Sequence, residues 1–301
     1  MGRLTAIVLG AAAGGGFPQW NCRCAPCRLA WAGDPRVKPR TQASVAVSTD
    51  GTHWILLNAS PDLRAQIQAN PRLHPHDDAR GSPISAVVLT GAEIDQTAGL
   101  LSLRERSPFA LYGTAATLAV VAANPMFGAL APDVVARRAV VAGQRFDLPG
   151  GAAAEFFIVP GKVPLYLEGD DPDTAAETSA NVGVEIIGGT ARLVYVPGAA
   201  AVTAAVRERL ARADAVLFDG TLYADDEMIA TGTGQKTGRR MGHLPLDGPD
   251  GTLAALKGLR CRRIIVHINN TNPILIDGSP ERARVTAAGW EVAEDGMEVV
   301  L

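Results

Sequence analysis

Short apolar runs rich in β-branched residues recur along the chain, bounded by glycine, proline and polar residues, and this pattern predicts buried strands. Several of the stretches between them favour helices, so strands and helices alternate, which is typical of α/β proteins. The predicted strands cover residues 1–10, 43–49, 53–57, 84–89, 109–112, 153–159, 163–167, 182–187, 192–196, 215–218 and 263–266. The predicted helices cover residues 61–69, 97–104, 114–123 and 199–211.

Local signals set some of these boundaries. Asp50-Gly51 joins two apolar runs and favours a hairpin, because both residues tolerate the positive φ of a tight turn. Ser60 followed by Pro61 is typical of a helix start, with serine as the N-cap and proline at the first helical position. No fixed-period repeat and no flexible linker divides the sequence, so we expect one domain over residues 1–301.

Two buried strands are followed at once by polar residues. Asp219 follows the strand at 215–218, and His267 follows the strand at 263–266. Open α/β sheets bind ligands outside the carboxyl ends of their strands, so both side chains are candidates for a functional site.

Composition narrows the class of protein. The chain has 28 Lys and Arg against 31 Asp and Glu, a net charge of −3, which gives no electrostatic reason to expect a nucleic-acid partner. No apolar run is long enough to span a bilayer, and the N-terminus lacks the apolar region of a secretory signal. We therefore expect a cytoplasmic protein.

Three of the four cysteines, Cys22, Cys24 and Cys27, lie within six residues in a C-x-C-x-x-C spacing. Thiolates this close can converge on one ion, and tetrahedral Zn²⁺ suits them. Three cysteines cannot all pair among themselves, so disulfides are disfavoured. The segment holds no histidine, and a fourth ligand must come from elsewhere. We predict that His267, aimed rigidly from the end of its strand, completes a structural Cys₃His zinc site.

A second group of candidate ligands lies in residues 89–100, which run from a strand through a tight loop into a helix. The frame T-x-x-x-x-D-x-x-x-G-L resembles the metal motif T-H-x-H-x-D-H-x-x-G-L of the metallo-β-lactamase superfamily. The motif's three histidine positions and its aspartate are held by Gly91, Glu93, Gln96 and Asp95. Later superfamily positions follow in the expected order and are Asp219, His243 and His267.

Three longer motifs narrow the resemblance to the family of coenzyme PQQ synthesis B proteins. They are G-G-G-F-P-Q-W-N-C at 14–22, N-A-S-P-D at 58–62 and H-I-N-N-T-N-P at 267–273, and the similarity runs from Gly10 to the C-terminus. The resemblance implies an αββα sandwich, a structural zinc on the three cysteines, and a role in making pyrroloquinoline quinone (PQQ). That cofactor is built from crosslinked glutamate and tyrosine of a precursor peptide.

The resemblance leaves the activity open. It implies either an iron-dependent hydroxylase of a tyrosine-derived PQQ precursor, or a factor that helps to transport PQQ or its precursor to the periplasm. A metal-dependent hydrolase fits less well, because the loss of histidines weakens a water-activating dinuclear site. Carboxylates with few imidazoles suit Fe(II) or another hard divalent ion. The catalytic residues of the hydroxylase interpretation are Glu93, Asp95, Gln96, Asp219 and His243.

The loop also allows a purely structural interpretation. Glu93 and Asp95 can cap the helix that begins near Thr97, where negative charge suits the helix dipole. On the hydroxylase or the carrier interpretation, we expect Lys162, Arg239 and Arg240 to bind the carboxylates of PQQ or its precursor.

Overall fold

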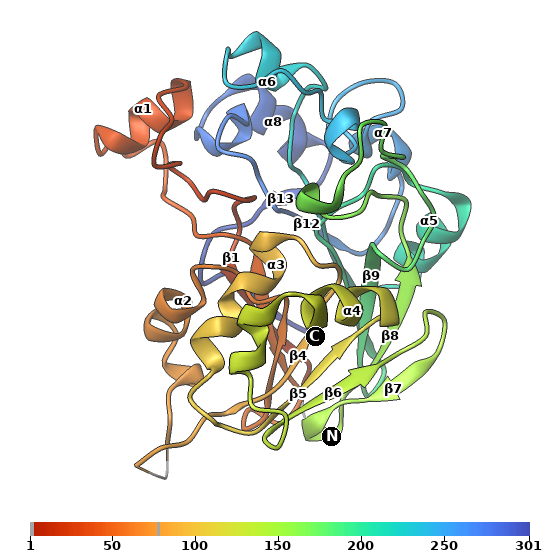
Figure 1. The fold of residues 1–301 in the computed structure, drawn as a ribbon. Coiled ribbons are helices and arrows are strands. Elements are labelled where there is room, and N and C mark those ends of the chain that lie inside the picture. The colour runs from red at the N-terminus through yellow and green to blue at the C-terminus, as the bar shows by residue number, and fades with distance from the viewer. Residues whose placement is uncertain (1–2, 77–78) are drawn as a thin grey trace.

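The computed structural model describes residues 3–76 and 79–301 of the chain. Two seven-stranded sheets pack face to face, and helices lie against the outer face of each, which gives an αββα sandwich (Figure 1). The first sheet has the strand order β14-β1-β2-β3-β4-β5-β6, and the second has the order β13-β12-β11-β10-β9-β8-β7. The fold class predicted from the sequence is confirmed.

The strands of the first sheet are β1 (Thr5–Gly10), β2 (Ser44–Ser48), β3 (Trp54–Leu57), β4 (Ile84–Val88), β5 (Phe109–Gly113), β6 (Val135–Ala139) and β14 (Glu298–Val300). Those of the second are β7 (Arg145–Asp147), β8 (Ala153–Ile158), β9 (Val182–Gly188), β10 (Ala191–Val196), β11 (Ala215–Asp219), β12 (Arg262–Val266) and β13 (Glu291–Val292).

The helices are α1 (Ala25–Trp31), α2 (Leu63–Ala69), α3 (Ile94–Thr97), α4 (Ala115–Ala123), α5 (Ala204–Ala211), α6 (Glu227–Ala230), α7 (Thr252–Ala255) and α8 (Pro280–Ala287). Short 3₁₀ turns include η2 (Ala98–Leu103), η5 (Leu165–Leu167) and η6 (Arg239–Met241). Among the described residues, no helix has both the length and the apolar character that crossing a bilayer requires.

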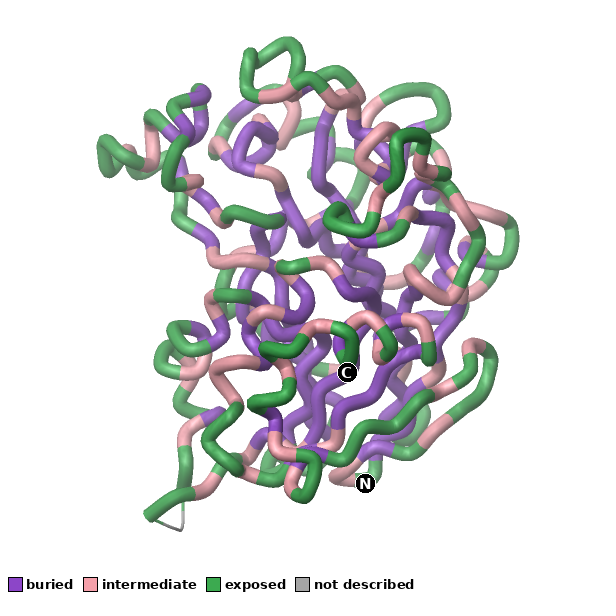
Figure 2. The backbone as a smooth tube through the Cα atoms, in the orientation of Figure 1, coloured by how far each residue is buried: buried purple, intermediate pink, exposed green. Residues whose placement is uncertain are grey.

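Alternation along the strands explains why the layers stack, because successive side chains point to opposite faces of a sheet. In β3, Ile55 and Leu57 belong to the core between the sheets, whereas Trp54 and Leu56 belong to the core under α2 and α4. Burying each such side chain stabilises the fold by about 1.5–3 kcal/mol. Figure 2 shows the buried backbone following the strands, with exposed backbone at the loops around them.

The predicted strand at 163–167 is wrong. Its residues form a loop that ends in η5, and Leu165, Tyr166 and Leu167 are all exposed. The apolar run suggested burial, but Pro164 has no N–H to offer a sheet, and no neighbouring strand pairs with the segment. The strands β6 and β7 lie at the sheet edges and were not predicted, because their sequences V-A-R-R-A and R-F-D are polar or short.

Smaller differences concern element boundaries. The helix predicted from Thr97 begins three residues earlier, as α3, and continues as η2. The helix predicted from Ala199 begins at Ala204, because the side chain of Thr203 accepts a hydrogen bond from the backbone N–H of Val206 and caps it there. Residues 1 and 2 of the first predicted strand lie outside the described residues.

Candidate metal sites and ligand cavity

The carboxyl ends of two neighbouring parallel strands place the first cluster. Asp219 is the last residue of β11 and is paired with Val266, the last residue of β12, so His267 emerges beside it. Asp95 comes from α3, in the loop after β4 of the other sheet, and its Oδ2 lies 2.8 Å from Nε2 of His267. The cluster therefore joins the ends of both sheets.

The backbone of His267 is strained. Its φ of +55° lies in the left-handed region, which costs a non-glycine residue about 1–2 kcal/mol. Such strain persists where the surrounding structure holds it, and it is concentrated at functional sites. At His267 the conformation aims the ring at Asp95, with the side chain 10% exposed.

Thr221 connects the other members of the cluster. Its Oγ1 donates a hydrogen bond of 2.6 Å to Oδ1 of Asp219, and it lies 2.8 Å from Nδ1 of His267 and 3.0 Å from Nδ1 of His243. Oδ2 of Asp219 is 2.7 Å from Nδ1 of His243. The two imidazole rings stack at 5.3 Å between centroids. No sequence pattern pointed to Thr221 as a member of this cluster.

Charge balance holds the cluster together. Burial raises the pKa of Asp219, but His243 and His267 more than offset it and hold this pKa far below its usual range. Burial lowers the pKa of His267, but its partners Asp219 and Asp95 raise it to about 10. The imidazolium is thus held between two carboxylates, whose negative charges stabilise it.

The donor set fits a divalent cation. Ligand atoms of Asp219, His243 and His267 lie within 4.8 Å of one another, and Asp95 adds a second carboxylate beside them. Two imidazoles with carboxylates suit non-haem Fe(II) or a related hard ion. Such an ion would replace the imidazole proton as the charge that the carboxylates face. The structure brings together three residues predicted to be catalytic, namely Asp95, Asp219 and His243.

Glu93 and Gln96 lie beside this cluster and are hydrogen-bonded elsewhere. Oε1 of Gln96 accepts a hydrogen bond of 3.1 Å from the backbone N–H of Glu93, which caps α3. The carboxylate of Glu93 lies 2.9 Å from Nζ of Lys162 and accepts from the backbone N–H of Leu165. The structural interpretation, in which Glu93 and Asp95 cap the helix, is therefore right only for Glu93, which is the N-cap residue of α3. The Asp95 carboxylate faces His267 instead. Both Glu93 and Gln96 line the cavity described below, and their catalytic role stays a prediction.

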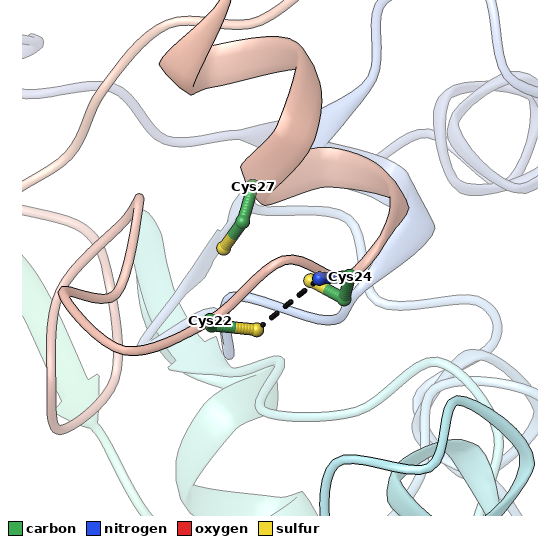
Figure 3. Close-up of side chains that lie close together, drawn as sticks. All are labelled: Cys22, Cys24 and Cys27. Atoms are coloured by element: carbon green, nitrogen blue, oxygen red, sulfur yellow. Dashed lines mark hydrogen bonds between the residues drawn. The ribbon is translucent and has the colours of Figure 1, made fainter.

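The cysteine cluster lies apart from the first one in the fold. The sulfur atoms of Cys22, Cys24 and Cys27 converge from a loop and the start of α1, within 4.8 Å of one another (Figure 3). All three are free thiols and are buried. Nδ2 of Asn270 lies 3.1 Å from Sγ of Cys22, 3.4 Å from that of Cys27 and 3.6 Å from that of Cys24. Asn270 is therefore the fourth member of this cluster.

The prediction that His267 completes the cysteine site is wrong. Both nitrogens of the His267 ring are hydrogen-bonded in the first cluster, to Asp95 and Thr221. The left-handed turn at this residue directs its ring to the cavity, and the chain reaches the cysteines only three residues later. No local sequence signal distinguishes these two directions, which depend on a single backbone φ angle.

The cysteine cluster also fits a cation. Burial raises the pKa of Cys24 to about 12 and also raises that of Cys27, so these thiols are protonated without a metal. A bound Zn²⁺ would reverse this, because it binds thiolates. Rotating the Asn270 side-chain amide by half a turn would point Oδ1, in place of Nδ2, at the three sulfur atoms. The metal would then have three sulfur ligands and one oxygen ligand.

A cavity of about 480 Å³ opens over the first cluster, within the range of sites for small molecules. His243 and His267 line one part of it, and Lys162 and Lys236 line another. Of the three predicted carboxylate-binding residues, Lys162 is in this lining. Arg239 pairs with Asp250 at 2.7 Å and Arg240 with Glu168 at 3.3 Å.

Known proteins resemble the chain over nearly its whole length. A family model described as a beta-lactamase superfamily domain matches residues 53–268. The chain is 54% identical over 296 residues to coenzyme PQQ synthesis protein B of Methylorubrum extorquens, which covers 98% of this chain and 99% of the relative. It is 55% identical over 299 residues to the protein of the same name from Methylobacterium nodulans, with 99% and 100% covered.

Solved structures have the same fold as this chain. The crystal structure of Zn²⁺-bound PqqB from Methylobacterium extorquens matches with a TM-score of 0.97 at 54% identity, covering 99% of this chain and 100% of that one. A diphosphatase of the PhnP family matches with a TM-score of 0.69 at 22% identity, covering 99% and 97%, a likeness of fold alone.

Proposed function

Because the chain belongs to the family of coenzyme PQQ synthesis B proteins, within the β-lactamase superfamily, we propose that it acts in PQQ biosynthesis as a metal-dependent hydroxylase of a tyrosine-derived precursor. One observation carries the proposal. Two imidazoles and two carboxylates converge where the cavity meets the ends of both sheets. Of the five histidines in the chain, only His243 and His267 lie in this cluster, and so few imidazoles disfavour the dinuclear site of a hydrolase.

Asp95, Asp219, His243 and His267 would hold the cation. Fe(II) bound there would supply the activation of O₂. In the overall reaction, one oxygen atom of O₂ would enter an aromatic C–H bond and the other would leave as water, with two electrons from an external reductant and two protons from solvent. Thr221 would hold both rings in position through its hydroxyl group.

The rest of the cavity would bind and orient the precursor. The precursor derives from glutamate and tyrosine and therefore carries carboxylates and an aromatic ring. Lys162 and Lys236 would pair with the carboxylates. Met228 and Met241 also line the cavity and offer apolar surface for the ring.

The cysteine cluster would have a structural role. Cys22, Cys24, Cys27 and Asn270 would hold one Zn²⁺ and fasten the N-terminal loop to the turn after β12. This support matters for the cavity, because the same turn carries His267.

The decisive experiment supplies the Fe(II)-loaded protein with the crosslinked glutamate–tyrosine precursor, a reductant and ¹⁸O₂. Hydroxylation predicts a product heavier by one ¹⁸O atom, and its loss in His243→Ala. A protein that binds the precursor and returns it unchanged under these conditions would instead be a carrier of PQQ or its precursor.

A further inference from the structure

Glu168 lies where a ligand carboxylate would bind. It meets three cationic groups, of which Lys162 and Lys236 line the cavity and Arg240 does not. Lys162 Nζ lies 2.8 Å from Oε1, Arg240 Nη1 lies 3.3 Å from Oε2, and Lys236 Nζ lies 3.6 Å from Oε2. The Glu168 side chain is only 7% exposed, although the segment that carries it lies on the surface. The three cations thus already hold one carboxylate, and it belongs to the protein itself.

The charges around Glu168 are unbalanced without it. Lys162 also pairs with Glu93 at 2.9 Å, so three cations face two carboxylates. If Glu168 moved out, three cations would face one carboxylate. Burial lowers the pKa of Lys162, but its pairs with Glu168 and Glu93 raise it above its usual value, so this lysine stays charged. An incoming carboxylate would therefore find a strongly favourable place once Glu168 has left.

The segment that carries Glu168 is held at its two ends. We name residues 163–177 the acidic strap. Near its start, Leu165 N–H donates to Glu93 and the Tyr166 hydroxyl donates to the carbonyl of Ala92. Near its end, the carbonyl of Ala176 accepts from Gly161 N–H at 3.1 Å. Within the described part of the chain, residues 169–175 form no backbone hydrogen bond with the rest of the protein. Glu168 itself lies at the end of η5, directly before this stretch, so the chain that follows it is not held by backbone hydrogen bonds until Ala176.

The strap is acidic from Glu168 onward, yet a single carboxylate points inward. Residues 168–177 include five acidic residues and no basic one. The other four are exposed and are Asp170, Asp171, Asp173 and Glu177. All five side chains carry the same charge, so the burial of Glu168 comes from its position in the strap and not from its charge.

We propose that Lys162, Lys236 and Arg240 form a carboxylate subsite of the cavity, and that Glu168 occupies this subsite until a ligand carboxylate displaces it. The inference rests on the proposed function for the class of ligand, an aromatic compound that carries several carboxylates. It adds the identity of the subsite and an internal competitor that the ligand must displace. Binding at this subsite is then coupled to opening of the acidic strap.

Calorimetric titration of the purified protein with PQQ, an aromatic tricarboxylate, tests the proposal. Glu168→Gln removes the competitor, so its Kd should fall about tenfold if the strap is open about a tenth of the time in the wild type. Asp170→Asn removes the same charge from the same strap and should leave the Kd within about twofold of the wild type. Lys162→Met should raise the Kd at least tenfold. Hydrogen exchange over residues 165–177 should become faster in Glu168→Gln.

Equal Kd values for Glu168→Gln and the wild type would overturn the proposal. A fall in the Kd of Asp170→Asn as large as that of Glu168→Gln would also overturn it, because the effect would then come from net charge alone. Benzene-1,3,5-tricarboxylate in a parallel titration separates this inference from the proposed function. Tighter binding of that compound by Glu168→Gln supports the subsite even if the protein never hydroxylates a PQQ precursor. Failure of both tricarboxylates to bind Glu168→Gln would refute the subsite itself.

Discussion

His267 and Asn270 lie three residues apart on one turn, and their side chains reach two different clusters. Nε2 of His267 is 2.8 Å from Asp95, at the cavity, whereas Nδ2 of Asn270 is 3.1 Å from the sulfur of Cys22. The left-handed conformation at His267 separates the two directions. Because one short turn serves both clusters, the position of the cavity histidine depends on how firmly the cysteines hold Asn270.

This relationship predicts which variant loses zinc. Asn270→Ala should lower the zinc affinity of the cysteine cluster by at least about tenfold, because it removes the fourth member of that cluster. His267→Ala should retain zinc and lose affinity for Fe(II). Metal analysis after dialysis against a graded series of chelators measures both.

Asn269→Ala is the matched control, since the Asn269 amide donates to Thr271 and does not contact the cysteines. It should retain zinc like the wild type. Loss of zinc from His267→Ala, with zinc retained in Asn270→Ala, would show that the histidine, and not Asn270, completes the cysteine site.

A second prediction concerns Thr221, whose hydroxyl contacts Asp219 and both histidine rings. Thr221→Val keeps the shape and removes these hydrogen bonds, so affinity for Fe(II) should fall about 10–100-fold. Thr221→Ser keeps a hydroxyl group at this position and should retain most of the wild-type affinity for Fe(II). The comparison is made by competition with a coloured chelator. Equal affinities for the valine and serine variants would show that the hydroxyl does not position the ligands.

Sequence reasoning located the centre of the fold and the chemistry of the site. Apolar runs identified β4, β11 and β12, because central strands are buried on both faces and carry little else. Asp219 and His267 then followed from their places at strand ends. Edge strands such as β6 were not predicted from the sequence. One side of an edge strand faces solvent and tolerates charged residues, so β6 has no apolar run.

The sequence could not predict the direction in which a side chain points. Whether the ring of His267 turns to Asp95 or to the cysteines depends on one backbone angle, and the partner of the cysteines, Asn270, is an ordinary amide in sequence. Likewise, residues 163–167 have the composition of a strand, but a strand forms only where another strand lies beside it to pair with. Whether one does depends on segments far away in the sequence. Long-range pairing of this kind leaves no local pattern.

Gly99 provides a test of the packing between η2 and the chain just before α2. A Cβ added at this position would lie 2.1 Å from the backbone carbonyl oxygen of Ser60, which cannot move as a flexible side chain can. Gly99→Ala should therefore lower the free energy of unfolding by about 1–3 kcal/mol or more. Gly128→Ala is the control, because an added Cβ there has no atom within 4 Å. Equal urea midpoints for the two variants would show that the contact at Ser60 is relieved at no cost.

The last prediction concerns stability in acid and rests on Glu185 in β9. Its side chain is 1% exposed, and its two oxygens pair with Arg192 at 2.7 Å and Arg209 at 2.6 Å. Burial raises the pKa of Glu185, but the two arginines more than offset this and hold the pKa below its usual value of 4.5. The unfolded chain therefore binds a proton at Glu185 at a higher pH than the folded protein does.

The sign of the pH dependence follows from this difference. The stability that Glu185 contributes is fully present above pH 4.5, the pKa of the free group, and is lost as the pH falls through the lower pKa of the folded state. Glu185→Gln should lower the free energy of unfolding at pH 7 by about 2–3 kcal/mol, less than for a fully buried pair because both arginines are partly exposed. The gap should shrink at pH 3, where the wild-type carboxylate is also becoming protonated. Urea denaturation at pH 7, 5 and 3 measures it. A gap as large at pH 3 as at pH 7 would mean that packing of the side chain, and not its charge, stabilises β9.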